Sequence, residues 1–347
     1  MTPPLFTPVQ VPKLVRGTRA ALPANPATQP PSHLSPLTSH LSPLIDFSTG
    51  ILSLGSCFAD EIASRLTDGG FNVEQNPFGT LYNPASIAAA LDRIIDCREI
   101  TEADLVQHEG LWHSWQHHGS FSRPTAQETL EVCNSRLHQA HQALRSADVL
   151  LITFGTAWVF EVKGERLEVK GNATQDIDST SHLSPLTSHL VVANCHKLPP
   201  QMFTRRRMTV DEIVSLWQPL LKKLRTHNSE LTTIFTVSPI RHLADGAHGN
   251  QLSKATLLLA IDQLVSIFNS QFSISYFPSY EIVLDELRDY RFFGPDMTHP
   301  TALAADIVYH RLQQATMSPA TIQQAHNNAK SARRSRHIPL HPSCRER

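Results

Sequence analysis

The sequence predicts an α/β fold in which helices cover both faces of a mostly parallel sheet. Short runs rich in β-branched and aromatic residues alternate along the chain with longer segments whose apolar residues recur at helical spacing. This alternation is typical of parallel sheets, because each connection between parallel strands must cross a face of the sheet. At 347 residues the chain is long enough for one large domain of this class or two small ones.

Five short runs rich in strand-forming residues are the expected strands, and each is short enough to be a buried strand. They lie at residues 51–54, 71–75, 149–154, 232–237 and 273–277. Six longer amphipathic stretches are the expected helices, and several begin near an Asp, Ser or Thr, the residue types that cap helix N-termini. They lie at residues 58–66, 84–95, 129–144, 210–224, 253–268 and 301–312.

Low-complexity segments flank and interrupt this pattern. Residues 1–44 hold ten of the 24 prolines and one glycine, which predicts a poorly ordered N-terminal segment. The sequence SHLSPLTSHL at 32–41 recurs unchanged at 181–190, and two such distant copies are expected to be inserted loops rather than a solenoid repeat. We therefore expect a domain at 45–318 with an inserted loop at about 174–190. A basic C-terminal tail is expected at 319–347, because the last eighteen residues hold six basic side chains and one acidic one.

Charge and cysteine content restrict the class of protein. Thirty Lys and Arg residues nearly balance 31 Asp and Glu residues, so a net charge of −1 gives no reason to expect nucleic acid or a membrane as a partner. Neither an apolar run of eighteen residues nor a secretory signal is legible. The five cysteines show no paired spacing, so we expect free thiols and a cytoplasmic location.

Motifs for cofactors and metals are absent from the sequence. It contains neither G-x-x-x-x-G-K nor G-x-G-x-x-G, so no nucleotide cofactor is expected. Residues 112–118 (WHSWQHH) place His113 and His117 four positions apart, yet no H-E-x-x-H and no acidic cluster accompany them. At this segment we expect packing, or a loop that stacks on a sugar, rather than a metal site.

The end of the first expected strand is the sharpest candidate site, because ligands of open parallel sheets bind beyond the carboxyl ends of the strands. Gly55 turns the chain there and places Ser56 and Cys57 at the start of a helix. Unpaired backbone N–H groups at a helix start lower the pKa of a thiol and bind an oxyanion, so either side chain could be an activated nucleophile. The alternative is structural: Ser56 caps the helix and Cys57 packs as a small apolar residue.

A second candidate group precedes the last expected helix. Asp296 and His299 lie three positions apart in a loop bounded by Gly294, Pro295 and Pro300. This spacing lets the carboxylate bind imidazole Nδ1 while Nε2 faces a cleft, which is the base-and-orienter half of a catalytic triad.

Six separated motifs resemble the GSCFA family, and the resemblance spans roughly residues 45–315. The motifs are residues 55–59 (GSCFA), 76–84 (NPFGTLYNP), 154–157 (FGTA), 194–197 (NCHK), 238–242 (SPIRH) and 296–299 (DMTH). This family is similar in turn to the SGNH or GDSL hydrolases. The resemblance therefore implies a flavodoxin-like α/β/α sandwich and an esterase, often one that removes acetyl groups from sugars.

The same resemblance implies catalytic roles by position. The hydrolases read Gly-Asp-Ser after the first strand, and an ungapped alignment puts Cys57 in the place of their nucleophile. Residue type alone would instead choose Ser56, one position earlier. His299 would be the base and Asp296 the carboxylate that orients it. A thiolate would suit acyl transfer through a thioester as well as hydrolysis.

Oxyanion donors and a substrate contact follow from the next strand ends. The resemblance assigns the oxyanion to the nucleophile's N–H and to Gly79. The hydrolases add an Asn after the third strand, where this chain reads Gly155 and Thr156, so Thr156 or the later Asn194 would have to substitute. Arg241, after the fourth strand, could bind a substrate carboxylate or phosphate, or form a structural ion pair.

The sequence thus predicts a cofactor-free esterase or acyltransferase acting on a carbohydrate ester or another small-molecule ester. Its alternative is a catalytically silent protein on the same fold that binds a carbohydrate or a partner. The Gly-Ser-Cys sequence and the missing Asn both favour that alternative.

Overall fold

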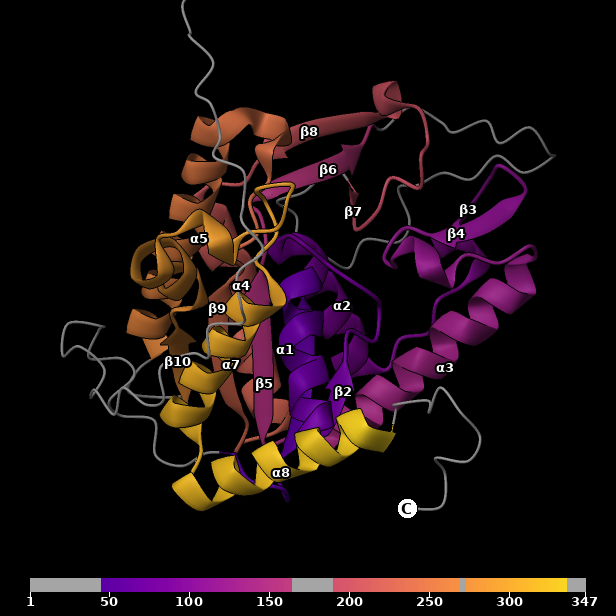
Figure 1. Ribbon diagram of the computed structural model, residues 1–347. Coiled ribbons are helices and arrows are strands. Elements are labelled where there is room, and N and C mark those ends of the chain that lie inside the picture. Colours follow the sequence, from indigo (N-terminus) through magenta and orange to yellow (C-terminus); the bar gives the residue numbers. More distant parts are fainter. Residues whose placement is uncertain (1–44, 164–189, 269–272, 336–347) are drawn as a thin grey trace, which may run out of the picture. The chain divides into compact units, whose positions relative to one another are not determined.

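The central element is a five-stranded parallel sheet with the strand order β10-β9-β5-β1-β2 (Figure 1). The computed structural model describes residues 45–163, 190–268 and 273–335, all within one compact unit, Leu37–Arg347. The strands are β1 (Gly50–Gly55), β2 (Asn72–Gln75), β5 (Val149–Phe154), β9 (Thr232–Val237) and β10 (Ile274–Phe277). All five expected strands are therefore confirmed.

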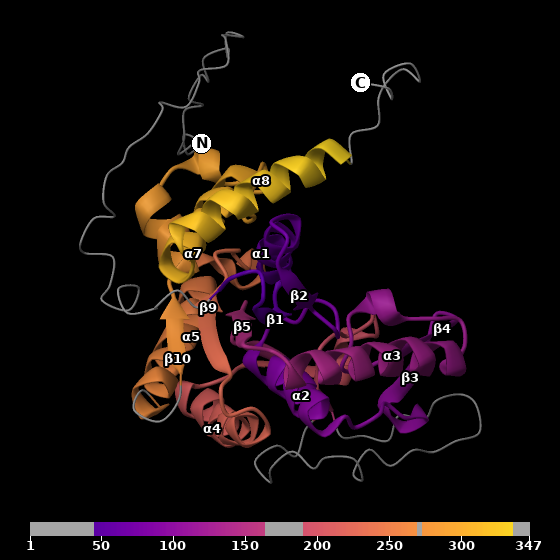
Figure 2. The same ribbon diagram turned by 90° about the horizontal axis from the view of Figure 1, so that it is seen from below.

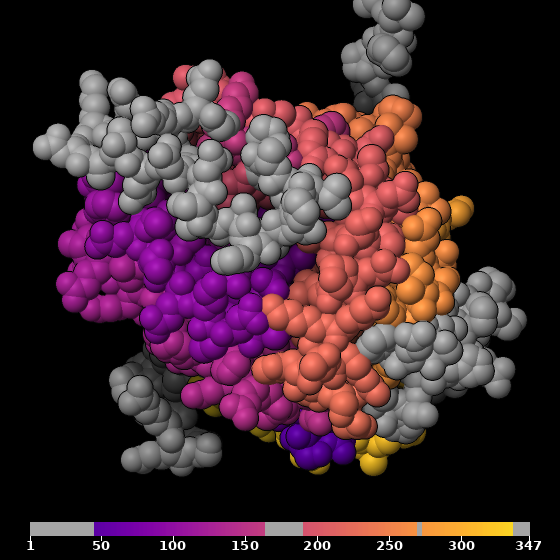
Figure 3. All heavy atoms as spheres, turned by 180° about the vertical axis from the view of Figure 1, so that it is seen from behind, coloured from indigo at the N-terminus to yellow at the C-terminus, as the bar shows by residue number. Residues whose placement is uncertain are grey.

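Helices cover both faces of the sheet (Figure 2). One face carries α1 (Cys57–Asp68), α7 (Ala302–Thr316) and α8 (Pro319–Ser335). The other carries α2 (Pro84–Asp96), α3 (Ala126–Arg145), α4 (Val210–His227) and α5 (Gly246–Phe268). On that second face the surfaces of α2 and α4 adjoin (Figure 3). The predicted three-layer fold class is confirmed.

The alternation of side chains along the strands explains these layers, since successive residues of a strand point to opposite faces. In β1, Leu52 and Leu54 belong to the core beneath α2–α5, whereas Ile51 belongs to the core beneath α1 and α7. In β5, Ile152 belongs to the core beneath α2–α5 and Leu151 to the core beneath α1 and α7. Both faces are apolar because both are covered, as expected for a parallel sheet.

Capping residues fix where several helices begin. The side chain of Asn83 accepts a hydrogen bond from Ser86 N at 2.8 Å at the start of α2. Thr209 forms a reciprocal capping box with Glu212 at the start of α4, and Thr125 does so at the start of α3. The six expected helices are all present.

The strand order places a switch point between β1 and β5. Renumbered along the sheet, β2-β1-β5-β9-β10 is the order 2-1-3-4-5 of flavodoxin-like folds. The chain leaves β1 toward one edge strand and later continues from β5 toward the other. Ligands of open parallel sheets bind at such a point, beyond the carboxyl ends of the two strands. The Gly55 turn lies at this point.

Two small antiparallel sheets were not predicted. One is the hairpin β3 (Leu105–His108) and β4 (Leu111–Ser114), and the other has the order β7-β6-β8. The second sheet contains β6 (Trp158–Val162), β7 (Val191–Val192) and β8 (Phe203–Arg207). The remaining short helices are η1 (Glu102–Asp104), η2 (Gly119–Phe121), η4 (Pro200–Met202), η5 (Leu243–Asp245), α6 (Ser279–Glu281), η6 (Ile282–Leu287, a π-helix) and η7 (Tyr290–Phe292).

The expected basic tail is wrong for residues 319–335, which form α8 and pack against α1 and α7. Ala325 is buried in the core of that face, and Asn328 Nδ2 donates to Gly69 O at 2.9 Å. The apolar face of α8 is too narrow to stand out in the sequence, where the basic residues dominate the pattern. The expected disordered segment 1–44 and nearly all of the inserted loop at 174–190 lie outside the described residues.

One helix in the described part of the chain, Leu243–Phe268, is long and apolar enough to cross a membrane by length and composition alone. Core helices of globular proteins meet the same criterion. Here Leu257, Ile261 and Leu264 of this helix are buried in the core beneath the sheet.

Candidate active site

The turn after β1 can be formed only by glycine. Gly55 has φ of +149°, and a Cβ there would lie 2.3 Å from Thr153 O on the neighbouring strand. Ser56 follows as the N-cap residue of α1, but its side chain makes no capping hydrogen bond. Ser56 thus holds the N-cap position that the structural alternative expects, but without a hydrogen bond from its hydroxyl. Cys57 packs against the core beneath α1 and α7, as the same alternative expects.

The two candidate nucleophiles have different surroundings. Ser56 is 1% exposed, and its Oγ has no hydrogen-bond partner among the described residues. Cys57 is partly exposed, and its Sγ lies 3.3 Å from Tyr82 Oη. Only Cys57 is accessible without movement of the surrounding loops.

Asn76 ties the turn to the loop after β2. Its Oδ1 accepts a hydrogen bond from Gly55 N at 2.8 Å, and its Nδ2 donates to Asp60 Oδ1 at 2.7 Å. Thr80 Oγ1 donates to the other oxygen of Asp60 at 3.2 Å. Burial raises the pKa of Asp60 above its usual value, against the effect of these hydrogen bonds.

The backbone groups predicted to bind an oxyanion are mostly engaged elsewhere. Gly79, which has φ of +75°, donates its N–H to Asn76 O at 2.7 Å. The N–H groups of Gly155 and Thr156 both donate to Tyr82 O, at 2.8 and 2.9 Å. Thr156 Oγ1 lies 3.1 Å from Ser253 Oγ.

Asn194, the other expected substitute, is also held locally. Its Oδ1 accepts from His196 N at 2.8 Å. It borders Gly119 rather than Ser56, Cys57 or Gly155, with none of which it makes a hydrogen bond in the described structure.

The start of α1 keeps two free donors. Within the described part of the chain, neither Cys57 N–H nor Phe58 N–H has a hydrogen-bond partner. Such groups at a helix N-terminus carry partial positive charge. They are therefore suited to stabilise negative charge that develops beside Cys57.

Lys254, on α5, links the loops after β5 and β9. Its Nζ donates to Gly155 O and to Ser238 O, both at 2.6 Å, and the side chain is almost completely buried. Burial lowers the pKa of Lys254 to about 7. The lysine thus holds Gly155 in place beside Ser56. The two residues are close neighbours, because a Cβ added to Gly155 would lie 3.3 Å from Ser56 Cβ.

Asp296 and His299 form the predicted pair. His299 Nδ1 lies 2.5 Å from Asp296 Oδ2, and Asp296 Oδ1 accepts from His299 N and Thr298 N at 3.0 and 2.9 Å. These hydrogen bonds hold the pKa of Asp296 below its usual value. With Nδ1 donating to the carboxylate, Nε2 keeps a free lone pair, as a general base requires.

A chain of contacts links this pair to Cys57. Arg241 N donates to Thr298 O at 3.1 Å, which fastens the His299 loop to the loop after β9. The next residue, His242, packs its ring edge-on against Tyr82 with centroids 5.9 Å apart, and Tyr82 contacts Cys57. In the described structure no hydrogen bond joins His299 to Ser56 or Cys57 directly.

Arg241 packs against an aromatic ring that precedes the His299 loop. Its guanidinium lies over the ring of Phe293, 4.7 Å from the centroid. Among the described residues it forms no ion pair, whereas nearby Arg205 is paired with Asp245.

Four residues of this edge were missed as functional groups: Asn76, Tyr82, His242 and Lys254. Asn76, Tyr82 and His242 lie inside motifs that carry the family resemblance, and those motifs could have marked them as candidates. Lys254 lies within a helix, and nothing in the sequence distinguishes it from a solvated lysine.

The histidine-rich segment 112–118 packs against the Gly79 loop. His117 stacks on Phe78 with ring centroids 4.2 Å apart, and burial lowers its pKa to about 3. His118 N donates to Phe78 O at 2.9 Å. Among the described residues, no three His, Cys, Asp or Glu side chains are grouped to hold a metal ion.

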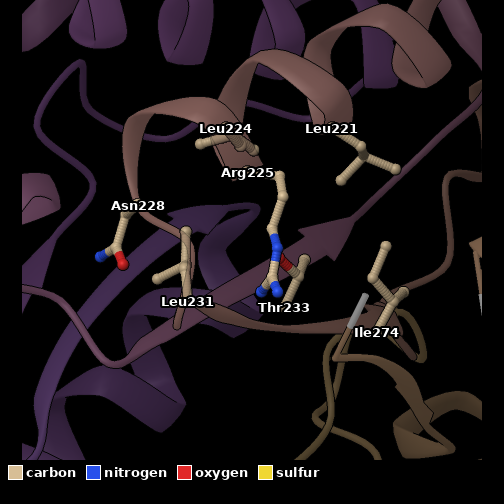
Figure 4. Close-up of a pocket in the computed structure, with 7 residues that line it drawn as sticks. All are labelled: Leu221, Leu224, Arg225, Asn228, Leu231, Thr233 and Ile274. Atoms are coloured by element: carbon tan, nitrogen blue, oxygen red, sulfur yellow. The ribbon is translucent and has the colours of Figure 1, made fainter. Parts of the chain in front are cut away.

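A shallow hollow lies away from this edge, where β9 and β10 begin (Figure 4). It is lined by Leu221, Leu224, Arg225, Asn228, Leu231, Thr233 and Ile274. None of the candidate site residues lines it, so the hollow is separate from the candidate active site.

No curated protein matches the sequence. A Bacteroides fragilis NCTC 9343 protein provisionally named an acylhydrolase is similar in structure, with 9% identity, 83% of this chain and 93% of that chain covered, and a TM-score of 0.36. A family 3 carbohydrate esterase from Clostridium thermocellum has 10% identity, coverages of 80% and 98%, and a TM-score of 0.34. One from Talaromyces cellulolyticus has 7% identity, coverages of 80% and 99%, and a TM-score of 0.34.

The family match is more extensive than these distant likenesses. The sequence matches the GSCFA family over residues 50–178 and 179–312, which together make up well over half of the chain. The matched segments contain the Gly55 turn, the 76–84 loop and the Asp296–His299 pair. This protein therefore belongs to the GSCFA family.

Proposed function

We propose that the protein is an SGNH-like esterase or acyltransferase in which Cys57 is the nucleophile and His299 the base. The observation that carries this proposal is the Asp296–His299 pair, whose orientation leaves Nε2 as an acceptor. The contacts through Arg241, His242 and Tyr82 connect that pair to the free N–H groups at the start of α1. Family membership and the 2-1-3-4-5 strand order support the same reading.

The reaction has two steps. Cys57 gives its proton to His299 Nε2, directly or through one water, and Sγ attacks the acyl carbon so that the carbonyl π electrons move to oxygen. Collapse of this intermediate breaks the C–O bond, and His299 returns the proton to the departing alcohol. Water or an acceptor hydroxyl then gives a proton to His299 and attacks the thioester. This releases the acid or a new ester and returns the proton to Cys57.

Cys57 is preferred to Ser56 on accessibility and hydrogen bonding. Ser56 Oγ is buried beside Gly155, whereas Cys57 is partly exposed and contacts a phenol that can donate to a thiolate. Ser56 as the nucleophile would require the loop after β5 to move.

The proposed substrate is an acyl ester of a carbohydrate or another small molecule, and Arg241 is proposed to bind an anionic group on it. An unpaired guanidinium beside the His299 loop is suited to a carboxylate or phosphate. Arg241 then selects among esters by their charge.

The test compares wild type with Cys57→Ala, Ser56→Ala and His299→Ala on short-chain nitrophenyl esters. We expect turnover to be abolished in the Cys57 and His299 variants and retained in Ser56→Ala. Loss of turnover in Ser56→Ala but not in Cys57→Ala would transfer the nucleophile's role to Ser56. A wild type that turns over no ester and has no selectively alkylated thiol would contradict the enzymatic proposal.

A binding protein without catalytic activity is the second candidate. One observation favours it: the backbone donors expected to hold the oxyanion, at Gly79, Gly155 and Thr156, already bond to other groups. Binding of acylated oligosaccharides without turnover would support this candidate.

A further inference from the structure

The hydrogen bonds around the switch point leave an oxyanion at Cys57 with an incomplete set of donors. Cys57 N–H and Phe58 N–H are available, but Gly79 N–H is held by Asn76 O. The loop after β5 adds no backbone donor, because the N–H groups of Gly155 and Thr156 both donate to Tyr82 O. Because each missing donor lowers the rate on the order of a hundredfold, another polar group must fill this place in an active enzyme.

Tyr82 is the group that the fold brings there. Its backbone carbonyl accepts the N–H groups of Gly155 and Thr156, and the preceding Leu81 donates its N–H to Gly55 O at 2.9 Å. The residue is thus anchored between the loops after β1 and β5, across the switch point. Its side chain then reaches Cys57, with Oη 3.3 Å from Sγ.

The phenol is suited to donate a proton in a hydrogen bond. Burial, the contact with Cys57 and the nearby charge of Asp60 all raise the pKa of Tyr82 well above its ordinary value. The hydroxyl therefore keeps its proton throughout the range in which an esterase works. No acceptor for it other than Cys57 Sγ exists among the described residues.

We propose that Tyr82 is a catalytic residue whose hydroxyl donates a hydrogen bond to the oxyanion formed at Cys57. This rests on the proposed function and replaces the missing Asn. Before attack, the same O–H donates to the Cys57 thiolate. When Sγ bonds to the acyl carbon, the negative charge moves from sulfur to the carbonyl oxygen, two bonds away. A donor in contact with Sγ needs only a small movement to follow that charge.

The substitution Tyr82→Phe tests this assignment. It keeps the ring that packs against His242 and the backbone bonds to the loop after β5, and it removes only the donor. We expect kcat for nitrophenyl esters to fall on the order of a hundredfold while KM changes little, because the lost bond forms in the transition state. Tyr290→Phe, at a side chain 76% exposed in η7, is the matched control and should leave both constants unchanged.

Alkylation of Cys57 by iodoacetamide gives a second measurement. A purely structural role of Tyr82 would leave this alkylation unchanged in the variant. Because the Tyr82 hydroxyl is proposed to donate to Sγ, the rate of alkylation at one fixed pH should fall in Tyr82→Phe and stay unchanged in Tyr290→Phe. Peptide mapping separates Cys57 from the other cysteines.

The outcomes distinguish this inference from the proposed function. Full activity of Tyr82→Phe, with Cys57→Ala and His299→Ala inactive, would overturn the role of Tyr82 and leave the proposed function standing. A change in kcat no larger than that of Tyr290→Phe, or an unchanged alkylation rate, would also overturn it. A wild type without esterase activity would overturn both.

Discussion

Replacing Asn76 by Ala should destabilise the protein through the turn that positions the nucleophile. The substitution leaves Gly55 N–H buried without an acceptor, which costs about 1–3 kcal/mol, and removes a donor from Asp60, which costs about 1 kcal/mol. Asn76 also has φ of +37°, a region that Ala adopts at a cost of about 1 kcal/mol. The expected loss is about 3–5 kcal/mol in the free energy of unfolding.

Urea unfolding measures this loss directly, as a lower midpoint with an unchanged slope. Thr80→Val is the matched control, because it removes the other, longer hydrogen bond to Asp60 at a half-buried site. We expect Thr80→Val to cost less than about 1 kcal/mol. Equal effects in the two variants, or a loss below about 1 kcal/mol for Asn76→Ala, would refute the account of this turn.

Three further predictions concern pH and catalysis. The pKa of His117 is about 3 in the folded protein and about 6.5 in the unfolded chain. The unfolded state therefore binds the extra proton, and the free energy of unfolding should fall as pH drops below 6.5, by up to about 1.4 kcal/mol per pH unit. His117→Phe should flatten this slope in urea titrations at pH 5 and 7. Asp296→Asn should lower kcat at least about a hundredfold, because Nδ1 loses its orienting acceptor, and an unchanged kcat would remove the residue from the mechanism. Arg241→Gln should raise KM about tenfold or more for a carboxylate-bearing ester and leave a neutral isostere unaffected; equal effects on both would exclude charge recognition.

The layers of the fold could be predicted because local and long-range signals agree in them. The strand at 149–154 is apolar except for Thr153, and the helix at 210–224 combines helical spacing with the Thr209 cap. The small sheets gave no such signal. Strand β8 is Phe-Thr-Arg-Arg-Arg, whose arginines read as exposed loop, yet Arg206 is held by Glu161 on β6 and Glu212 on α4. Contacts of this kind depend on tertiary structure.

Two local features of the candidate site were predictable, but its hydrogen bonds between loops were not. The turn at Gly55 and the pair at Asp296 and His299 follow from spacing, because both involve neighbours in the sequence. The engagement of Gly79 N–H and Thr156 N–H depends on which carbonyl the folded loops bring near, and sequence spacing does not specify this. Tyr82 acquires its contact with Cys57 only when the loop after β2 folds back across β1.

Mapping the acylated residue tests the central claim most directly. The protein is mixed with a nitrophenyl ester, quenched in acid within the first turnover and digested, and the acylated peptide is identified by mass spectrometry. The account predicts an acyl group on Cys57 that neutral hydroxylamine removes, as expected for a thioester. An acyl group resistant to hydroxylamine on Ser56, or no acylated peptide despite turnover, would contradict it.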